Sequence, residues 1–258
     1  MGTSVVEPGL PLAVVLALLT ALAAAGGRLS GLGQERPVAV AALRATAQLA
    51  AVSAVLLAVV RSLWLSAAFV LVMGTVASVT AAGRVTGLPL RAPGAARRVA
   101  TAALAVAGGA APVVALVLAS GTVPLRGEAV IPVAGIVIGG AMTATSLAGR
   151  RLRDELTGRR GEVEAALALG LLPRDAVLEV GRPSAATALV PPLDQTRTVG
   201  LVTLPGAYVG VLLGGGSPTA AGAAQLLVLV GLLAAEVLAV WIVTELVARG
   251  RVLPGLPR

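Results

Sequence analysis

Long apolar stretches dominate the pattern of hydrophobic and polar positions along the chain. Each has about 20 residues, the length that an α-helix needs to cross the hydrocarbon core of a bilayer. All are expected to be helices, because an open strand leaves backbone groups unpaired in lipid. The pattern predicts an all-α, polytopic membrane protein with a single transmembrane domain over 1–258. The seven predicted spans are Pro8 to Ala25, Val38 to Val60, Leu63 to Ala82, Val99 to Ser120, Ala129 to Ala148, Thr198 to Gly215 and Ala221 to Val247.

The arginines predict how these helices are oriented. Positively charged segments favour the cytoplasmic side of a membrane. With the N-terminus outside, the cytoplasmic segments from Arg28 to Arg258 hold 16 arginines, and the outer segments hold only Arg61 and Arg126. A wrongly added or lost helix would invert this alternation. The split therefore predicts seven transmembrane helices in an N-out, C-in topology.

Composition agrees with a membrane protein and excludes several kinds of site. The chain is 57% hydrophobic and 12% charged, whereas soluble domains have about 45–50% and about 25%. It has no His and no Cys, which excludes a Ser-His-Asp triad, a Cys-His pair and a His- or Cys-based zinc site. All 20 basic residues are Arg, and a P-loop needs Lys, so this chain is not expected to hydrolyse ATP. The net charge of +8 follows the predicted topology, and no nucleic-acid partner is expected.

One predicted cytoplasmic connection, about 150–197, is much longer than the others. A helical run from Glu162 to Leu169 is followed by Gly170, which suits a helix end. Pro173 suits the start of a second helix that continues through Val180. The pattern predicts a cytoplasmic helix-turn-helix between the fifth and sixth spans. A solvated linker with incidental helicity is the alternative.

The sequence of this connection is close to a known motif. Glu164-Ala165-Ala166-x-x-x-Gly170 is similar to the E-A-A loop of bacterial ABC importer permeases, although Gly181 and Arg182 depart from its usual ending. In that pattern a short helix fits a groove on a separate ATPase. The resemblance implies a coupling role for Glu164, Ala165, Ala166, Gly170 and Arg174.

Two further segments, Ile131 to Ala144 and Ala188 to Gly206, resemble the FetB family of iron-export ABC permeases. Arg44, Gln48 and Gln225 extend the resemblance. It implies a multi-pass subunit of a bacterial cytoplasmic membrane that exports iron or another metal ion. It also implies a homodimer and a separate ABC ATPase that binds ATP and Mg, with no cofactor on this chain.

This chain lacks an asparagine and two methionines of the FetB pattern. Gly140 stands where the family usually has Asn, and Ala207-Tyr208 stands where it usually has two Met. Because methionine and asparagine can contact a metal ion along a pathway, these differences bear on the substrate.

Glu236 is the main candidate for a site within the membrane. Ionisable groups inside a bilayer are costly, so they tend to line cavities or to pair. Two interpretations stay open: Glu236 faces the substrate route and draws a cation, or it pairs with a buried polar group such as Arg44. Mainly oxygen ligands are available, so no stable metal-binding site is expected. The expected pathway residues are Glu236, Met142, Thr143, Tyr208, Gln225, Arg44 and Gln48.

Small residues mark the sixth stretch as a special helix. Gly206, Gly210 and Gly214 recur at every fourth position behind Pro205. This spacing lets helices approach closely, and proline interrupts helical hydrogen bonding. Either a mobile helix at a dimer interface or pathway, or tight packing within the chain, would explain the pattern.

Other function classes remain as alternatives to an ABC permease. An ion-coupled secondary transporter needs inverted repeats and coupling carboxylates in both halves, and the first half offers no buried carboxylate. An intramembrane enzyme using Glu236 or Asp194 would lack a second clustered carboxylate. The preferred interpretation is a transport subunit without enzymatic activity of its own.

Overall fold

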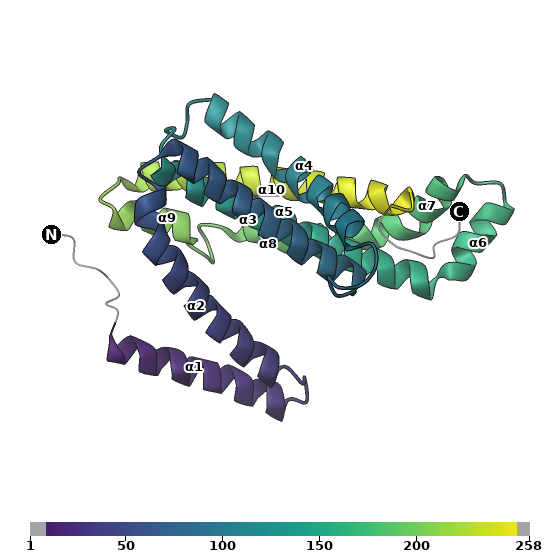
Figure 1. The fold of residues 1–258 in the computed structure, drawn as a ribbon, viewed down its shortest axis with the longest axis horizontal. Helices are drawn as coiled ribbons and strands as arrows, with labels where there is room; N and C mark the ends of the chain where they lie inside the picture. The colour runs from purple at the N-terminus through teal and green to yellow at the C-terminus, as the bar shows by residue number, and fades with distance from the viewer. Residues whose placement is uncertain (1–8, 252–258) are drawn as a thin grey trace. The chain divides into compact units, whose positions relative to one another are not determined.

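The computed structural model describes residues 9–251, so the predicted span start at Pro8 and the cytoplasmic Arg258 lie outside the described residues. The described part is all-α, as predicted, apart from one isolated bridge between Val199 and Thr203. Its elements are α1 (Leu10–Leu29), α2 (Glu35–Val59), α3 (Leu63–Thr86), α4 (Ala95–Ala119), α5 (Gly127–Gly158), α6 (Arg160–Ala168), α7 (Pro173–Ala186), η1 (Thr187–Leu189), α8 (Val190–Thr198), α9 (Gly206–Leu213) and α10 (Pro218–Ala248) (Figure 1).

Two compact units make up the chain, and the first comprises residues up to Val59. Within it, α1 and α2 pack against each other. Gly31 and Gly33, both with positive φ, form the turn between them. No residue of α1 is buried, and apolar side chains surround the helix. A helix that is apolar on all sides is suited to lipid or to burial against other helices.

The second unit, from Val60 onward, is a bundle of α3, α4, α5 and α10. Small residues bring these helices close together. A Cβ on Gly109 of α4 would lie 2.6 Å from the Ala235 carbonyl oxygen of α10, and one on Gly149 of α5 would lie 2.5 Å from Val85 of α3. Close backbone approach of this kind is the usual packing mode of helices in membranes, where van der Waals contact replaces the hydrophobic effect.

The helices α3, α5 and α10 run in the same direction (Figure 1). At one end, a Cβ on Gly127 would meet Ser66, so the first turns of α5 and α3 lie together. At the other end, the Arg153 guanidinium of α5 donates to the Val85 carbonyl of α3 at 3.1 Å. The chain must therefore return along the bundle between α5 and α10.

This return differs from the prediction of one continuous sixth helix over Thr198 to Gly215. Six helices are long and apolar enough to cross a membrane within residues 9–251, and this segment is not one of them. Helix α8 ends at Thr198, and α9 has only eight residues. Pro205 lacks the N–H group that a continuing helix needs. Gly200, at φ +82°, starts a turn in which its N–H donates to the Thr203 carbonyl.

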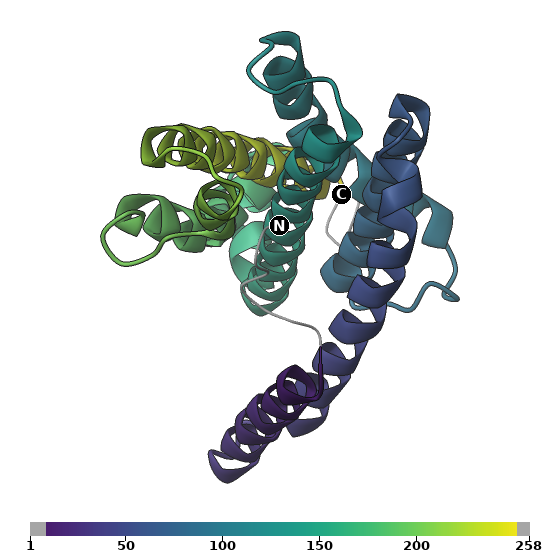
Figure 2. The same ribbon diagram turned by 90° about the vertical axis from the view of Figure 1, so that its left-hand side faces the viewer.

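The return path is a series of short elements rather than a single helix. In chain order, α7, η1, α8 and α9 each contact α10. Figures 1 and 2 show the green segments α8 and α9 beside α10. If α5 and α10 both cross a bilayer in the same direction, this broken path supplies the crossing between them.

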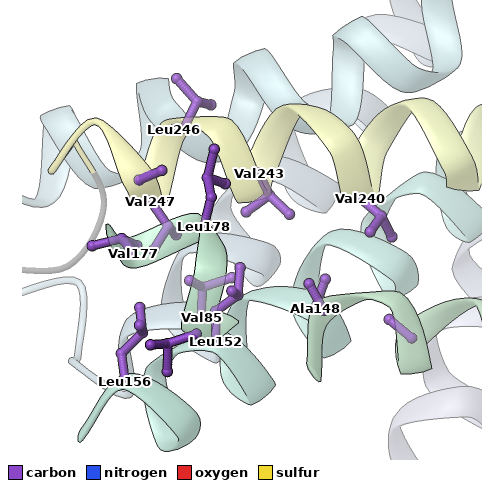
Figure 3. Close-up of a cluster of buried hydrophobic side chains, with 14 of the residues drawn as sticks. Val85, Ala148, Leu152, Leu156, Val177, Leu178, Val240, Val243, Leu246 and Val247 are labelled. Carbon is purple, nitrogen blue, oxygen red and sulfur yellow. The ribbon is translucent and has the colours of Figure 1, made fainter. Parts of the chain in front are cut away.

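A buried apolar cluster joins the C-terminal ends of the long helices to α7 (Figure 3). We call it the terminal cluster; its larger members are Val85, Leu152, Leu156, Val163, Val177, Leu178, Val180, Val240, Val243, Leu246 and Val247. Helix α5 continues ten residues beyond the predicted span end at Ala148, and these residues carry Leu152 and Leu156 into the cluster. The cluster fixes α6 and α7 to the ends of α3, α5 and α10.

Candidate coupling and transport sites

The predicted helix-turn-helix is present, formed by α6 and α7. Gly170 adopts φ +92°, and its N–H donates to the Leu167 carbonyl. The next N–H, of Leu171, donates to the Ala166 carbonyl at 3.1 Å, which completes a Schellman motif. Pro173 is the first residue of α7, as predicted, but α7 continues past Val180 to Ala186. The turn is thus a well-defined corner rather than a loose linker.

The outer side of this corner is apolar and exposed. Leu169 is 83% exposed and Leu172 is 69% exposed, whereas Val163 is buried in the terminal cluster. The motif residues Glu164 and Ala165 are also exposed, and Ala166 is partly buried. Leucines that project from a docked hairpin are suited to insertion into a groove on another protein.

Charged contacts hold the base of α6. Arg159 donates from Nε to Glu162 at 2.6 Å and from Nη1 to Glu155 at 2.8 Å. The hydrogen bond from Arg159 holds the pKa of the Glu162 carboxyl below its ordinary value. Arg160 pairs with Glu164 one turn along α6, at 2.9 Å. The charges stabilise the corner between α5 and α6, and the exposed leucines remain free of them.

Gly181, which departs from the importer motif, has a structural explanation. A Cβ at this position would lie 2.8 Å from a methyl group of Leu152 on α5. The residue is buried where α7 crosses α5. A larger side chain here would push α7 away from the terminal cluster.

Arg174 and Glu245 join α7 to the end of α10. The guanidinium donates from Nε and Nη2 to the two carboxylate oxygens, at 2.7 and 2.8 Å. This pair raises the pKa of Arg174 above its ordinary value. Arg249, one turn further along α10, donates to the same carboxylate at 2.6 Å. The contact with Arg174 was not expected, because no local pattern relates two residues so far apart in sequence.

Glu236 lies inside the bundle. It is 7% exposed, and its Oε2 atom has no hydrogen-bond partner within residues 9–251. Its Oε1 lies 3.0 Å from the position of a Cβ on Gly140 of α5. The carboxyl group therefore uses space that the absence of a side chain at position 140 leaves open.

The other expected pathway residues are distributed over several places. Thr143 is exposed one turn beyond Gly140, and its hydroxyl donates to the Gly139 carbonyl. Met142 packs against the apolar core between α3, α4 and α5. Arg44 and Gln48 are exposed on α2, in the first unit.

Tyr208 and Gln225 do come together. The Gln225 side-chain oxygen accepts a hydrogen bond from the Tyr208 N–H at 3.1 Å and so caps the first turn of α9. Both residues line a pocket of about 270 Å³, together with Gly200, Pro205 and Leu229. Gln225 is 5% exposed, so burial and capping explain it without a ligand.

The glycine repeat of α9 is not packed within the chain. A Cβ on Gly206 or Gly210 would meet nothing within 4 Å, and one on Gly214 would meet only backbone of its own helix. Within the second unit, therefore, nothing packs closely against this repeat, and the small-residue face of α9 is open there.

Comparison with known proteins agrees with this architecture. The uncharacterised protein family UPF0014 matches residues 10–251. The UPF0014 membrane protein STAR2 of rice is 36% identical over 84% of this chain and 74% of its own length. The Arabidopsis protein ALUMINUM SENSITIVE 3 is 36% identical over 64% of this chain and 58% of its own.

A bacterial relative carries a functional name. The probable iron export permease protein FetB of Escherichia coli is 34% identical over 48% of this chain and 48% of its own length. No solved structure matches the chain significantly. The extent of the family match, together with the apolar helices, shows that the chain is a multi-pass membrane protein of the UPF0014 family, the family that includes the FetB-type permease.

Proposed function

We propose that this protein is the membrane permease of an ABC transporter that exports iron or another metal ion across the bacterial cytoplasmic membrane. ATP and Mg are bound by a separate ATPase, and two copies of the permease form a homodimer in an N-out, C-in orientation. The similarity to the FetB permease supports the class of substrate. The observation that carries the proposal is the rigid α6–α7 hairpin, whose apolar corner faces outward.

The hairpin is suited to bind a partner at its leucine corner and to transmit movement to the bundle at its base. Leu169, Leu171 and Leu172 project from its corner. Val163 and Val177 hold its base in the terminal cluster. A force on the corner is therefore transmitted to α5 and α10, because a closely packed interior deforms little.

Helix α10 extends this connection toward Glu236. The Arg174–Glu245 pair joins α7 to α10 directly. Glu236 lies nine residues before Glu245, which is about 14 Å along a helix. ATP-driven movement of α7 would thus shift the buried carboxyl relative to Gly140 of α5.

Glu236 is the residue that we propose to interact with the transported cation. Its oxygen without a partner is suited to a brief contact with a metal ion, because carboxylates are common ligands of hard cations. No cluster of three His, Cys, Asp or Glu residues that could hold a metal occurs in the described part of the chain. A weak contact agrees with transport, since a tightly held ion would not leave.

The partner is tested by co-purification with the ATPase encoded nearest this gene. The wild type is compared with Leu169→Glu/Leu172→Glu, and with Glu179→Ala as an exposed control on α7. We expect the double variant to lose the ATPase and the control to keep it. Failure of the wild type to bind any ATPase would favour the ion-coupled secondary transporter instead.

The substrate is tested in liposomes that contain the complex and a panel of metal ions. We expect iron or another metal to stimulate ATP hydrolysis and to be transported. Glu236→Gln keeps the shape of the side chain but removes its charge, so the variant should fold and assemble yet lose transport. A variant that transports normally would contradict the role of Glu236.

A further inference from the structure

Helix α8 lies beside the long apolar helix α10 but has an exposed, polar surface. None of its residues is buried. The Asp194 and Arg197 side chains are 61% and 72% exposed, and Gln195 between them is exposed as well. The two charges lie 3.6 Å apart within one helix and form no other ion pair within the described residues of the second unit.

Its neighbours place α8 at the depth of the spans. At its start, η1 lies beside α5, where the Arg151 guanidinium donates to the Thr187 hydroxyl. Beyond its end, α9 is capped by Gln225, which lies about 30 Å along α10 from Glu245. Helix α8 lies between these levels and contacts α10 (Figure 1).

Such a surface is incompatible with lipid. Polar and charged groups at this depth face a protein or an aqueous cavity, because lipid offers them no hydrogen bonds. The turn at 199–205 adds backbone groups outside any helix. Something other than lipid must therefore cover this side of α8 and the turn.

The charges themselves indicate what covers it. An interface with two-fold symmetry brings the same surface of two copies together, so residue i of one meets residue j of the other and the reverse. Asp194 and Arg197 share one face of α8, so with the axis passing between them Asp194 of each copy can meet Arg197 of the other. The interface would then contain two Asp194–Arg197 pairs, and its net charge would be zero.

The open face of α9 continues this surface. Gly206 and Gly210 have nothing within 4 Å of where a Cβ would lie, and this spacing permits a second helix to approach closely. Polar contacts at α8 and small residues at α9 thus lie on consecutive parts of one return path.

We propose that α8, the turn at 199–205 and α9 form the contact between two copies of this chain, with reciprocal Asp194–Arg197 pairs at its centre. This inference deepens the proposed function and rests on it for the homodimer. It also predicts that the polar groups of α8 lie at the meeting point of the two bundles.

Site-specific cross-linking tests the contact. The chain contains no Cys, so Val190→Cys introduces a single thiol on the Asp194 face of α8, where the side chain is 51% exposed, and a bis-maleimide can join two copies in native membranes. Leu71→Cys on α3, which is 72% exposed, is the control for random encounters, and each yield is divided by the fraction of thiol that a monofunctional maleimide labels. We expect several-fold more cross-linked dimer from Val190→Cys. Equal yields from the two variants would overturn the proposal.

Charge exchange tests the pairing. In the Val190→Cys background, Asp194→Arg should lower the dimer yield, and addition of Arg197→Asp should restore it. A reduced yield that is not restored, in protein that remains monodisperse, would contradict the reciprocal pairs. The assay needs neither ATPase nor metal, so dimerisation and the proposed transport activity can fail independently.

Discussion

The Arg174 guanidinium and the Glu245 carboxylate form a two-point hydrogen bond, at 2.7 and 2.8 Å, between the first turn of α7 and the last turn of α10. The two helices also pack together through the terminal cluster. The pair adds direction to this packing, because a planar guanidinium fixes the orientation of a carboxylate. It is the direct polar connection between the hairpin and the helix that carries Glu236.

Arg174→Lys should weaken the stimulation of ATP hydrolysis by the transported metal. Lysine keeps the charge but cannot form the two parallel hydrogen bonds. We expect metal-stimulated ATP hydrolysis in liposomes to fall several-fold, while co-purification with the ATPase is retained because the leucine corner is unchanged. Arg182→Lys, at an exposed position of α7, is the control. Loss of the ATPase complex would instead indicate that Arg174 contacts the ATPase.

Gly181→Leu should destabilise the protein. The added side chain would collide with Leu152 in the terminal cluster. Overpacking of this kind costs about 1–3 kcal/mol, measurable as a lower thermal unfolding temperature in detergent. Gly161→Leu is the matched control, because a Cβ there meets nothing within 4 Å. Equal unfolding temperatures for the two variants would show that α7 can move away from Leu152 without loss of stability.

Gly170→Val should disturb the corner between α6 and α7. The cause is backbone conformation rather than lack of space, since φ is +92° and nothing lies within 4 Å of the Cβ position. A left-handed conformation costs a residue other than glycine roughly 1–2 kcal/mol. We expect faster trypsin cleavage at Arg174 and weaker binding of the ATPase. Gly170→Asn should have a smaller effect, because asparagine tolerates this conformation better; the reverse order would contradict the explanation.

Gln225→Met should loosen α9 and leave the bundle intact. The substitution removes the oxygen that accepts the Tyr208 N–H but keeps a similar volume. Loss of a helix cap costs about 1 kcal/mol. In a Gly206→Cys background, Gln225→Met should lower the yield of cross-linked dimer. Leu226→Met, at an exposed neighbouring position, should leave this yield unchanged. Unchanged cross-linking would show that α9 does not depend on this cap.

Much of the architecture could be predicted from sequence because it depends on local patterns. Six of the apolar stretches form long helices, since length and hydropathy decide whether a segment can be a membrane helix. Gly170 and Pro173 placed the corner of the hairpin correctly, because each has a strong conformational preference. The resemblance in 131–144 and 188–206 led to the family that the comparison confirms.

Tertiary structure decided what depends on residues distant in sequence. The break between α8 and α9 replaced a predicted helix: Gly200 and Pro205 favour a turn locally, but the contacts of the two short helices with α10 depend on the fold. The partner of Glu245, the contact of Gly181 with Leu152 and the open face of Gly206 follow from helix packing alone. Sequence therefore determined where the six long helices lie and where the hairpin turns, since these are local properties of the chain. Packing determined which side chains meet and which surfaces stay uncovered, because those depend on how the helices are brought together in space.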